Sequence, residues 1–172
     1  SARIYENGEA HLASVKRAFE GCSFGGHKLR FVTEVQCTGE GFDSIHALVL
    51  PIMPALSAEA FSAVQAYADS KRTILRASTA IPYDAWGHSR DEVLSFALDT
   101  LLVRGQDSST EYLHSLDAAF ATGQIENRPH AVNGYGYTLE GVKTQSVVYD
   151  GATYLYLLNV RKEAVKCYLS TG

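Results

Sequence analysis

The stretch that decides the fold class lies near the C-terminus, where residues 147–158 read VVYDGATYLYLL. Asp150-Gly151 separates two runs that are rich in β-branched and aromatic residues. This dipeptide favours a type I′ turn, because both central residues of that turn need positive φ. A two-residue turn predicts an antiparallel hairpin in which Tyr149 faces Ala152.

Further strands are expected outward from this hairpin: residues 29–37 alternate apolar and polar side chains, and residues 43–50 indicate a strand that is buried on both faces and ended by Pro51. The expected strands span residues 29–37, 43–50, 73–77, 135–142 and 164–169. The last two extend the hairpin into a C-terminal meander. The register of the first turns Cys37 toward the core.

Helix end signals predict four helices. N-cap side chains accept hydrogen bonds from the unpaired backbone N–H groups at a helix start, and glycine readily adopts the left-handed conformation that ends a helix. The expected N-caps are Asn7, Ser57, Ser89 and Ser108, and the helices end near Gly21, Lys71, Gly105 and Gly123. Glu92 and Glu111 complete capping boxes in the third and fourth helices. The inward stripes are Leu12, Val15 and Phe19; Phe61, Val64 and either Tyr67 or Ala68; Leu94, Ala97, Leu98 and Leu101; and Leu113, Leu116 and Phe120.

The order of these elements predicts an α+β fold. Helices do not separate every pair of strands, so a doubly wound parallel sheet is disfavoured, and we expect a mainly antiparallel sheet with a C-terminal β-meander packed by about four helices. The length of 172 residues and the absence of a linker-like stretch predict a single domain over residues 1–172.

Composition narrows the class of partner. The chain has 46% hydrophobic and 20% charged residues, and 15 Lys and Arg are interspersed with 19 Asp and Glu. No basic stripe is visible, so we expect no nucleic-acid binding. The longest stretch without charge, residues 44–58, contains Pro51 and Pro54 and is too short to span a bilayer, so no membrane insertion is expected. The oligomeric state is left open.

The three cysteines, Cys22, Cys37 and Cys167, allow two interpretations. Three reduced cysteines would favour the cytoplasm, whereas a Cys22–Cys37 disulfide would favour an exported or periplasmic protein. No cysteine or histidine pair has zinc-ligand spacing, so no metal site is expected. Leu139 stands where a dinucleotide-binding loop would need glycine, so no cofactor is expected either.

One loop combines residue types that catalysis uses. Asp84, Trp86, His88 and Asp91 lie within ten residues, and a histidine oriented by a carboxylate can act as a general base in a small hydrolase. A structural interpretation competes with this one: Ser89 caps a helix, Asp91 complements its dipole, and Trp86 fills the core. Whether the chain is an enzyme stays open at this level.

The tyrosines give a more distinctive pattern. In the expected register, Tyr149, Tyr154 and Tyr156 share one face of the hairpin, and the opposite face, with Val148, Leu155 and Leu157, is the expected core face. Tyrosine is enriched at recognition surfaces. The leading hypothesis is therefore a non-enzymatic inhibitor, immunity-type or adaptor protein that binds a protein partner through these tyrosines and Trp86.

Packing of the tyrosines under helices is the competing interpretation. The functional alternatives are a small hydrolase that uses the Asp84, His88 and Asp91 loop, and a carrier with a small-ligand cavity between sheet and helices.

Overall fold

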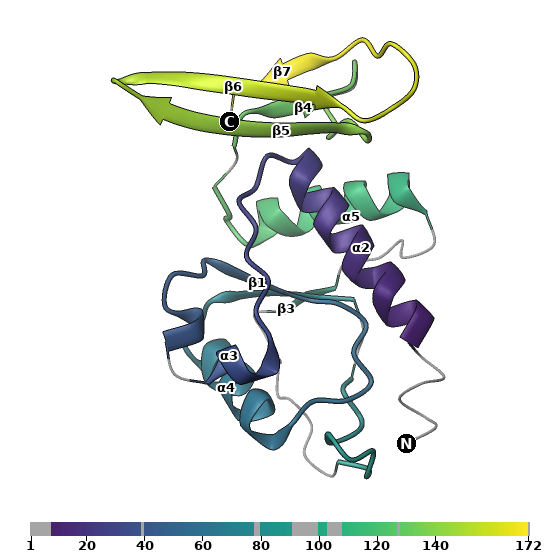
Figure 1. The fold of residues 1–172 in the computed structure, drawn as a ribbon, viewed down its shortest axis with the longest axis vertical. Coiled ribbons are helices and arrows are strands. Elements are labelled where there is room, and N and C mark those ends of the chain that lie inside the picture. The colour runs from purple at the N-terminus through teal and green to yellow at the C-terminus, as the bar shows by residue number, and fades with distance from the viewer. Residues whose placement is uncertain are drawn as a thin grey trace. The chain divides into compact units, whose positions relative to one another are not determined.

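The computed structural model of the chain describes residues 8–38, 40–77, 80–90, 100–102, 108–126 and 128–171. Helices and antiparallel strands combine in an α+β fold, which confirms the predicted class (Figure 1). The chain groups into two compact units, residues 1–15 with 31–103 (unit 1) and residues 16–30 with 104–172 (unit 2). The expectation of one domain stays a prediction.

Unit 1 is built around a three-stranded parallel sheet in the order β1-β2-β3. Its strands are β1 (Ala47–Leu50), β2 (Thr73–Arg76) and β3 (Thr100–Leu102). Helix α4 (Ala58–Asp69) connects β1 to β2, because parallel neighbours need a crossover that a tight turn cannot supply.

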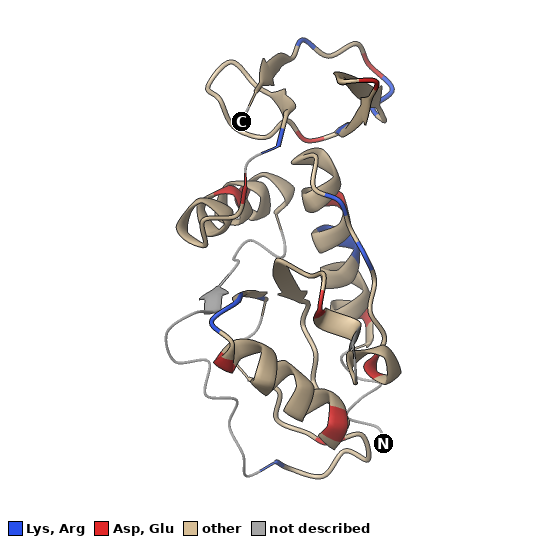
Figure 2. Cartoon of the chain, turned by 90° about the vertical axis from the view of Figure 1, so that its left-hand side faces the viewer, with Lys and Arg blue, Asp and Glu red and all other residues tan. Residues whose placement is uncertain are grey.

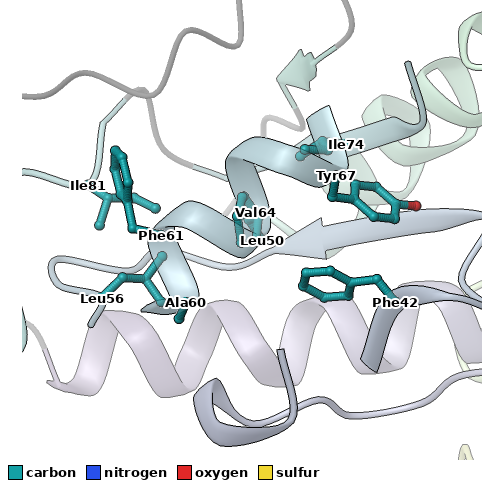
Figure 3. Close-up of a cluster of buried hydrophobic side chains, with 9 residues drawn as sticks. All are labelled: Phe42, Leu50, Leu56, Ala60, Phe61, Val64, Tyr67, Ile74 and Ile81. Carbon is teal, nitrogen blue, oxygen red and sulfur yellow. The ribbon is translucent and has the colours of Figure 1, made fainter. Parts of the chain in front are cut away.

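Helix α4 begins where its N-cap predicts, and its apolar face carries the core of unit 1. The Ser57 hydroxyl accepts a hydrogen bond from the backbone N–H of Ala60 at 3.2 Å. Phe42, which ends the short 3-10 helix η1 (Glu40–Phe42), packs edge-to-face on Tyr67 with ring centroids 5.2 Å apart. The buried cluster contains Phe42, Leu50, Leu56, Ala60, Phe61, Val64, Tyr67, Ile74 and Ile81 (Figure 3).

Unit 2 holds two helices in close contact. Helix α5 (Ser109–Thr122) is capped by Ser108, whose hydroxyl accepts the N–H of Glu111 at 3.3 Å. The C-terminal part of helix α2 (Gly8–Phe24) approaches α5 at Gly21. A methyl group on Gly21 would lie 2.8 Å from Cε1 of Tyr112, so only glycine fits this contact without a shift.

The strands of unit 2 form two antiparallel pairs. Strands β5 (Val142–Tyr149) and β6 (Ala152–Asn159) make the predicted hairpin, with Tyr149 opposite Ala152. Asp150 and Gly151 have φ of 48° and 73°, as a type I′ turn requires. Strand β7 (Tyr168–Ser170) pairs with β4 (His130–Val132).

The expected strand over 135–142 is replaced by a turn followed by β5. Asn133 accepts the backbone N–H groups of Tyr135 and Tyr137 through its side-chain oxygen, and Gly136 has φ of 84°. An Asx-type turn of this kind competes with strand formation. The hairpin is therefore not continued by its neighbour in sequence, and the last strand instead joins β4.

The strand expected over 29–37 is also wrong. Residues 31–33 are irregular, and helix α3 (Glu34–Cys37) follows them. The Gln36 side chain accepts the backbone N–H and the hydroxyl of Thr33, so local capping outweighs the alternating pattern. Cys37 is only half-buried, although it does pack against the unit 1 cluster.

Two helix predictions need correction. The third helix cannot extend to Gly105 as predicted, because residues 100–102 are strand β3. Ser89 makes an antiparallel bridge with Tyr83 instead of an N-cap. The rest of the prediction, including Glu92, Leu94, Ala97, Leu98 and Arg104-Gly105, lies outside the described residues. A short apolar run fits a buried strand as well as a helix stripe.

The first helix runs past Gly21 to Phe24, and its Leu12 is exposed instead of inward-facing. Its proposed cap, Asn7, lies outside the described residues. Strand β1 begins at Ala47, four residues later than the expected strand 43–50.

The turn of the β5–β6 hairpin gives the first test. Gly151→Val should lower the free energy of unfolding by about 1 kcal/mol or more, because a β-branched residue is strained at positive φ. No atom lies within 4 Å of a Cβ at this position, so the backbone is the source of the effect. The urea midpoint measures it. Asp150→Asn is the matched control and should leave the midpoint unchanged, because asparagine tolerates this conformation; equal midpoints for both variants would contradict the turn type.

Candidate functional site

Three tyrosines of the β5–β6 hairpin lie on one side of its two strands. Gln145 is opposite Tyr156, and Val147 is opposite Tyr154. Because side chains alternate between the two faces of a strand, Tyr149, Tyr154 and Tyr156 share a face. Their exposed fractions are 71%, 49% and 61%. We call these three residues the tyrosine face; no described helix buries them.

The tyrosine face extends to residues that the sequence analysis did not single out. Val147 and Leu158 are exposed and have the same strand parity as the tyrosines. The same alternation could have identified both. At the far end of the hairpin from the turn, Lys143 lies with its Nζ 4.9 Å from the ring centroid of Phe19 in α2. This cation–π contact ties the base of the hairpin to a helix of unit 2.

The opposite face of the hairpin is a core face only at its base. Val142 and Thr144 are buried, and the Thr144 hydroxyl accepts the backbone N–H of Ala131 at 3.2 Å. Val148, beside the turn, is 72% exposed, and Leu157, which lies opposite Thr144 at the base, is also exposed. The prediction that Val148 and Leu157 face the core is therefore wrong, because burial on this face is confined to Val142 and Thr144 of β5 and does not extend to these two residues.

The loop proposed for catalysis forms a tight turn in unit 1. The backbone N–H groups of Trp86 and His88 donate to Oδ1 of Asp84 at 2.9 Å and 2.8 Å. Oδ2 of Asp84 lies 3.1 Å from Nδ1 of His88. Gly87, at φ of 83°, allows the chain to turn back. Both oxygens of Asp84 thus hold the turn together.

The chemistry of this turn follows from its exposure. Partial desolvation acts to raise the pKa of Asp84, but the hydrogen bonds from His88 and Trp86 lower it below the ordinary value. The His88 side chain is 78% exposed, and Asp91 lies outside the described residues. The carboxylate–histidine contact of the hydrolase hypothesis is present, and its bonding pattern is typical of a structural turn.

Trp86 stands at the tip of that turn with 79% of its surface exposed. The structural interpretation in which it fills the core is therefore wrong. An exposed indole offers a flat apolar surface with one N–H donor. Trp86 belongs to unit 1 and the tyrosine face to unit 2, so each is described by itself as a candidate site.

Lys and Arg of the described ranges are spread over several elements, with Asp and Glu among them (Figure 2). In the described part of the chain, no group of three or more His, Cys, Asp or Glu residues is arranged to hold a metal ion. Among the same residues, no helix has the length and apolar character needed to cross a membrane.

The three cysteines are free. Cys22 is buried in unit 2, and desolvation raises the pKa of its thiol to about 12. The pKa of Cys37 is raised as well, first by desolvation and then by the nearby Glu34 carboxylate. Cys22, Cys37 and Cys167 thus form no disulfide in this structure.

A second titratable group in unit 2 escaped the sequence analysis because its partners are distant in sequence. The ring of His27 stacks on Phe120 with centroids 4.2 Å apart. Desolvation lowers the pKa of His27 to about 4, with further lowering by His130 and Arg128 and an opposing effect of Asp117. His27 is thus a half-buried histidine that stays neutral at pH 7 and packs against Phe120.

No family model matches the sequence, and no curated protein matches it. One similar solved structure is that of apo exo-carrageenase GH42 from Bacteroides ovatus, with a TM-score of 0.62 and 18% sequence identity. The likeness covers 87% of this chain and 20% of that chain, so this chain spans about one fifth of the enzyme's length. At this identity the comparison concerns the fold alone.

The buried thiol gives a labelling prediction. In the native protein at pH 8, Cys22 should react with a maleimide only after unfolding, because it is 2% exposed and its pKa is about 12. Peptide mapping by mass spectrometry locates the label, and Cys37 serves as the half-exposed internal control. Labelling of native Cys22 at the rate of Cys37 would contradict its burial.

His27 gives a prediction about the pH dependence of stability. The folded state resists protonation of His27 until about pH 4, whereas the unfolded chain takes up that proton near the ordinary value of 6.5. The contribution of His27 to stability is therefore complete above pH 6.5 and declines as the pH falls toward 4. His27→Phe, which keeps an aromatic ring on Phe120, should flatten this part of the stability profile.

Urea unfolding at several pH values between 4 and 8 measures this effect. The exposed His46 provides a matched control, and His46→Gln should keep the decline of the parent protein. A His27→Phe profile that matches that of the parent would show that His27 is not the group responsible.

Proposed function

We propose that this chain is a non-enzymatic binding protein that recognises a protein partner through the tyrosine face. The observation that carries the proposal is the exposure of Tyr149, Tyr154 and Tyr156 in one row on a regular hairpin. Exposed aromatic rows cost solubility, and where they occur on a protein surface they mark interaction sites. Tyrosine suits such a site because its ring supplies contact area and its hydroxyl keeps a polar group available.

The shape of the surface favours a macromolecule over a small ligand. The tyrosines are carried by a two-stranded sheet whose residues near the turn are exposed on both faces. Small-molecule sites are concave and bury most of the ligand. A sheet face instead fits a partner with a broad, complementary surface, of the kind that places aromatic residues at its centre.

A second candidate function is that of a non-catalytic part of a carbohydrate-active enzyme. The fold likeness to one fifth of an exo-carrageenase favours it. Trp86, the single tryptophan of the chain, is an exposed ring on a hydrogen-bonded turn, and an aromatic face can stack on the C–H groups of a sugar ring. Titration with carrageenan fragments should then change Trp86 fluorescence, and an unchanged spectrum would remove this candidate.

Replacement of a tyrosine tests the leading proposal. Tyr156→Ala should abolish binding of the partner while the melting temperature changes little, because Tyr156 is 61% exposed and its loss leaves no buried cavity. Binding is measured by quantitative mass spectrometry of proteins retained on the immobilised chain, and stability by thermal unfolding. Tyr149→Ala should act in the same direction.

Tyr135 is the matched control, because it is 89% exposed and lies in the turn before β5, outside the hairpin. Tyr135→Ala should retain every protein that the parent retains. If Tyr156→Ala retains the same proteins as Tyr135→Ala, the tyrosine face is not the recognition surface. A loss of several kcal/mol of stability would show instead that Tyr156 acts in packing.

A further inference from the structure

The outer edge of β6 carries backbone groups that the hairpin leaves unused. In a two-residue hairpin the pair that flanks the turn exchanges both backbone hydrogen bonds, and every second pair does so after it. The pair Tyr149 and Ala152 flanks the turn. The same parity holds at the other end, where the N–H of Val160 donates to the carbonyl of Gly141 at 2.9 Å.

This register decides which groups of β6 point outward. Tyr154 and Tyr156 direct their N–H and C=O groups to β5, whereas Thr153, Leu155 and Leu157 direct theirs away from it. We call these three residues the β6 edge. Across the described part of the chain, the backbone groups of the β6 edge have no hydrogen-bond partner. They form a row of donors and acceptors at the spacing of a strand.

Within β6 itself, the edge has none of the sequence features that protect natural sheet edges. Such edges carry a lysine or another charge, a proline, a bulge or a covering element. The sequence of β6 is ATYLYLLN, which contains neither a charged residue nor proline, and its pairing with β5 is regular over all eight residues. An unprotected edge of this kind accepts another strand, because only a polypeptide backbone matches its alternating donors and acceptors.

The edge is complementary to itself. Antiparallel pairing of two β6 edges centred on Leu155 places Thr153 opposite Leu157 of the second copy, and Tyr154 opposite Tyr156 of the second copy. No charged residue meets another along this strand, since β6 has none. Aromatic pairs across neighbouring strands stabilise antiparallel sheets, most of all at the positions where the backbones do not exchange hydrogen bonds. Tyr154 and Tyr156 occupy those positions.

We propose that the β6 edge pairs with the β6 edge of a second copy of this chain, which gives a symmetric dimer with a continuous four-stranded antiparallel sheet. The two copies use the same residues, as a two-fold axis requires. This inference goes beyond the proposed function because it uses the edge of the hairpin and leaves the tyrosine face uncovered. The joined sheet would present the tyrosines of both copies on one side.

Mass and amide exchange together test the dimer on the unaltered full chain. Light scattering after size exclusion should give twice the monomer mass of 18.7 kDa as the protein concentration is raised. Hydrogen exchange should slow with concentration at the amides of Thr153, Leu155 and Leu157, whereas those of Tyr154 and Tyr156 should be protected at every concentration. A monomer at all concentrations, or a dimer in which the three edge amides still exchange freely, would overturn the proposal.

Matched charge variants add a second test. Leu155→Lys places like charges opposite each other at the two-fold axis and should give a monomer. Val148→Lys adds the same charge to the same face of the hairpin but on β5, and should still give the dimer. Circular dichroism checks that both fold. If Leu155→Lys does not fold, Thr153→Pro replaces it, because this substitution removes an outward N–H and none of the hydrogen bonds between β5 and β6. A dimeric edge variant would contradict the proposed pairing.

The outcome for the dimer is distinct from the outcome for the proposed function. Tyr149 lies opposite Ala152 beside the turn and outside the proposed tyrosine pairs, so Tyr149→Ala tests the tyrosine face without removing an edge contact. A monomer whose protein partner is lost on Tyr149→Ala would overturn the dimer alone. A dimer that forms normally and retains no partner would count against the tyrosine face alone.

Discussion

Positive φ at two consecutive residues, Asp150 and Gly151, fixes the strand pairing of the C-terminal hairpin and, with it, the residues on each face. A type I′ turn allows only one pairing of the strands that leave it. A slip by one residue would exchange the two faces, placing Val148 and Leu157 where the tyrosines now lie. The turn therefore decides which side chains are exposed together and which backbone groups point away from the partner strand.

The sequence predicted the elements whose ends are marked by residues close by in the chain. The caps Ser57 and Ser108 mark the starts of α4 and α5, and the Asp-Gly turn marks the hairpin, because each signal acts within a few residues of the element it begins. Two failures need tertiary context. Strand β3 pairs with β2 as a parallel neighbour, and β4 pairs with a strand almost forty residues away. The failure at residues 34–37 is local, since the Gln36 side chain accepts hydrogen bonds from Thr33 at the start of α3.

The sequence predicted which residues of the candidate site share a face, because strand alternation is a local property, but it did not predict their exposure. Period-two alternation placed three tyrosines on one face, and the register confirms that arrangement. Their exposure could not be predicted, because it depends on which helices cover the hairpin. The assumption that the opposite face is buried along its whole length failed at Val148 for this reason. His27 escaped notice since Phe120, His130 and Asp117 meet it only in the folded chain.

Gly21 has a consequence for recognising distant relatives of this fold. The position faces the Tyr112 ring at a distance that excludes even a methyl group. The Leu116 side chain closes the same space, with its Cδ2 2.9 Å from such a methyl group. A divergent sequence can therefore keep this helix contact with glycine at position 21, or with smaller residues at both positions 112 and 116. The three positions are thus coupled by volume, so a search for remote relatives can score them together.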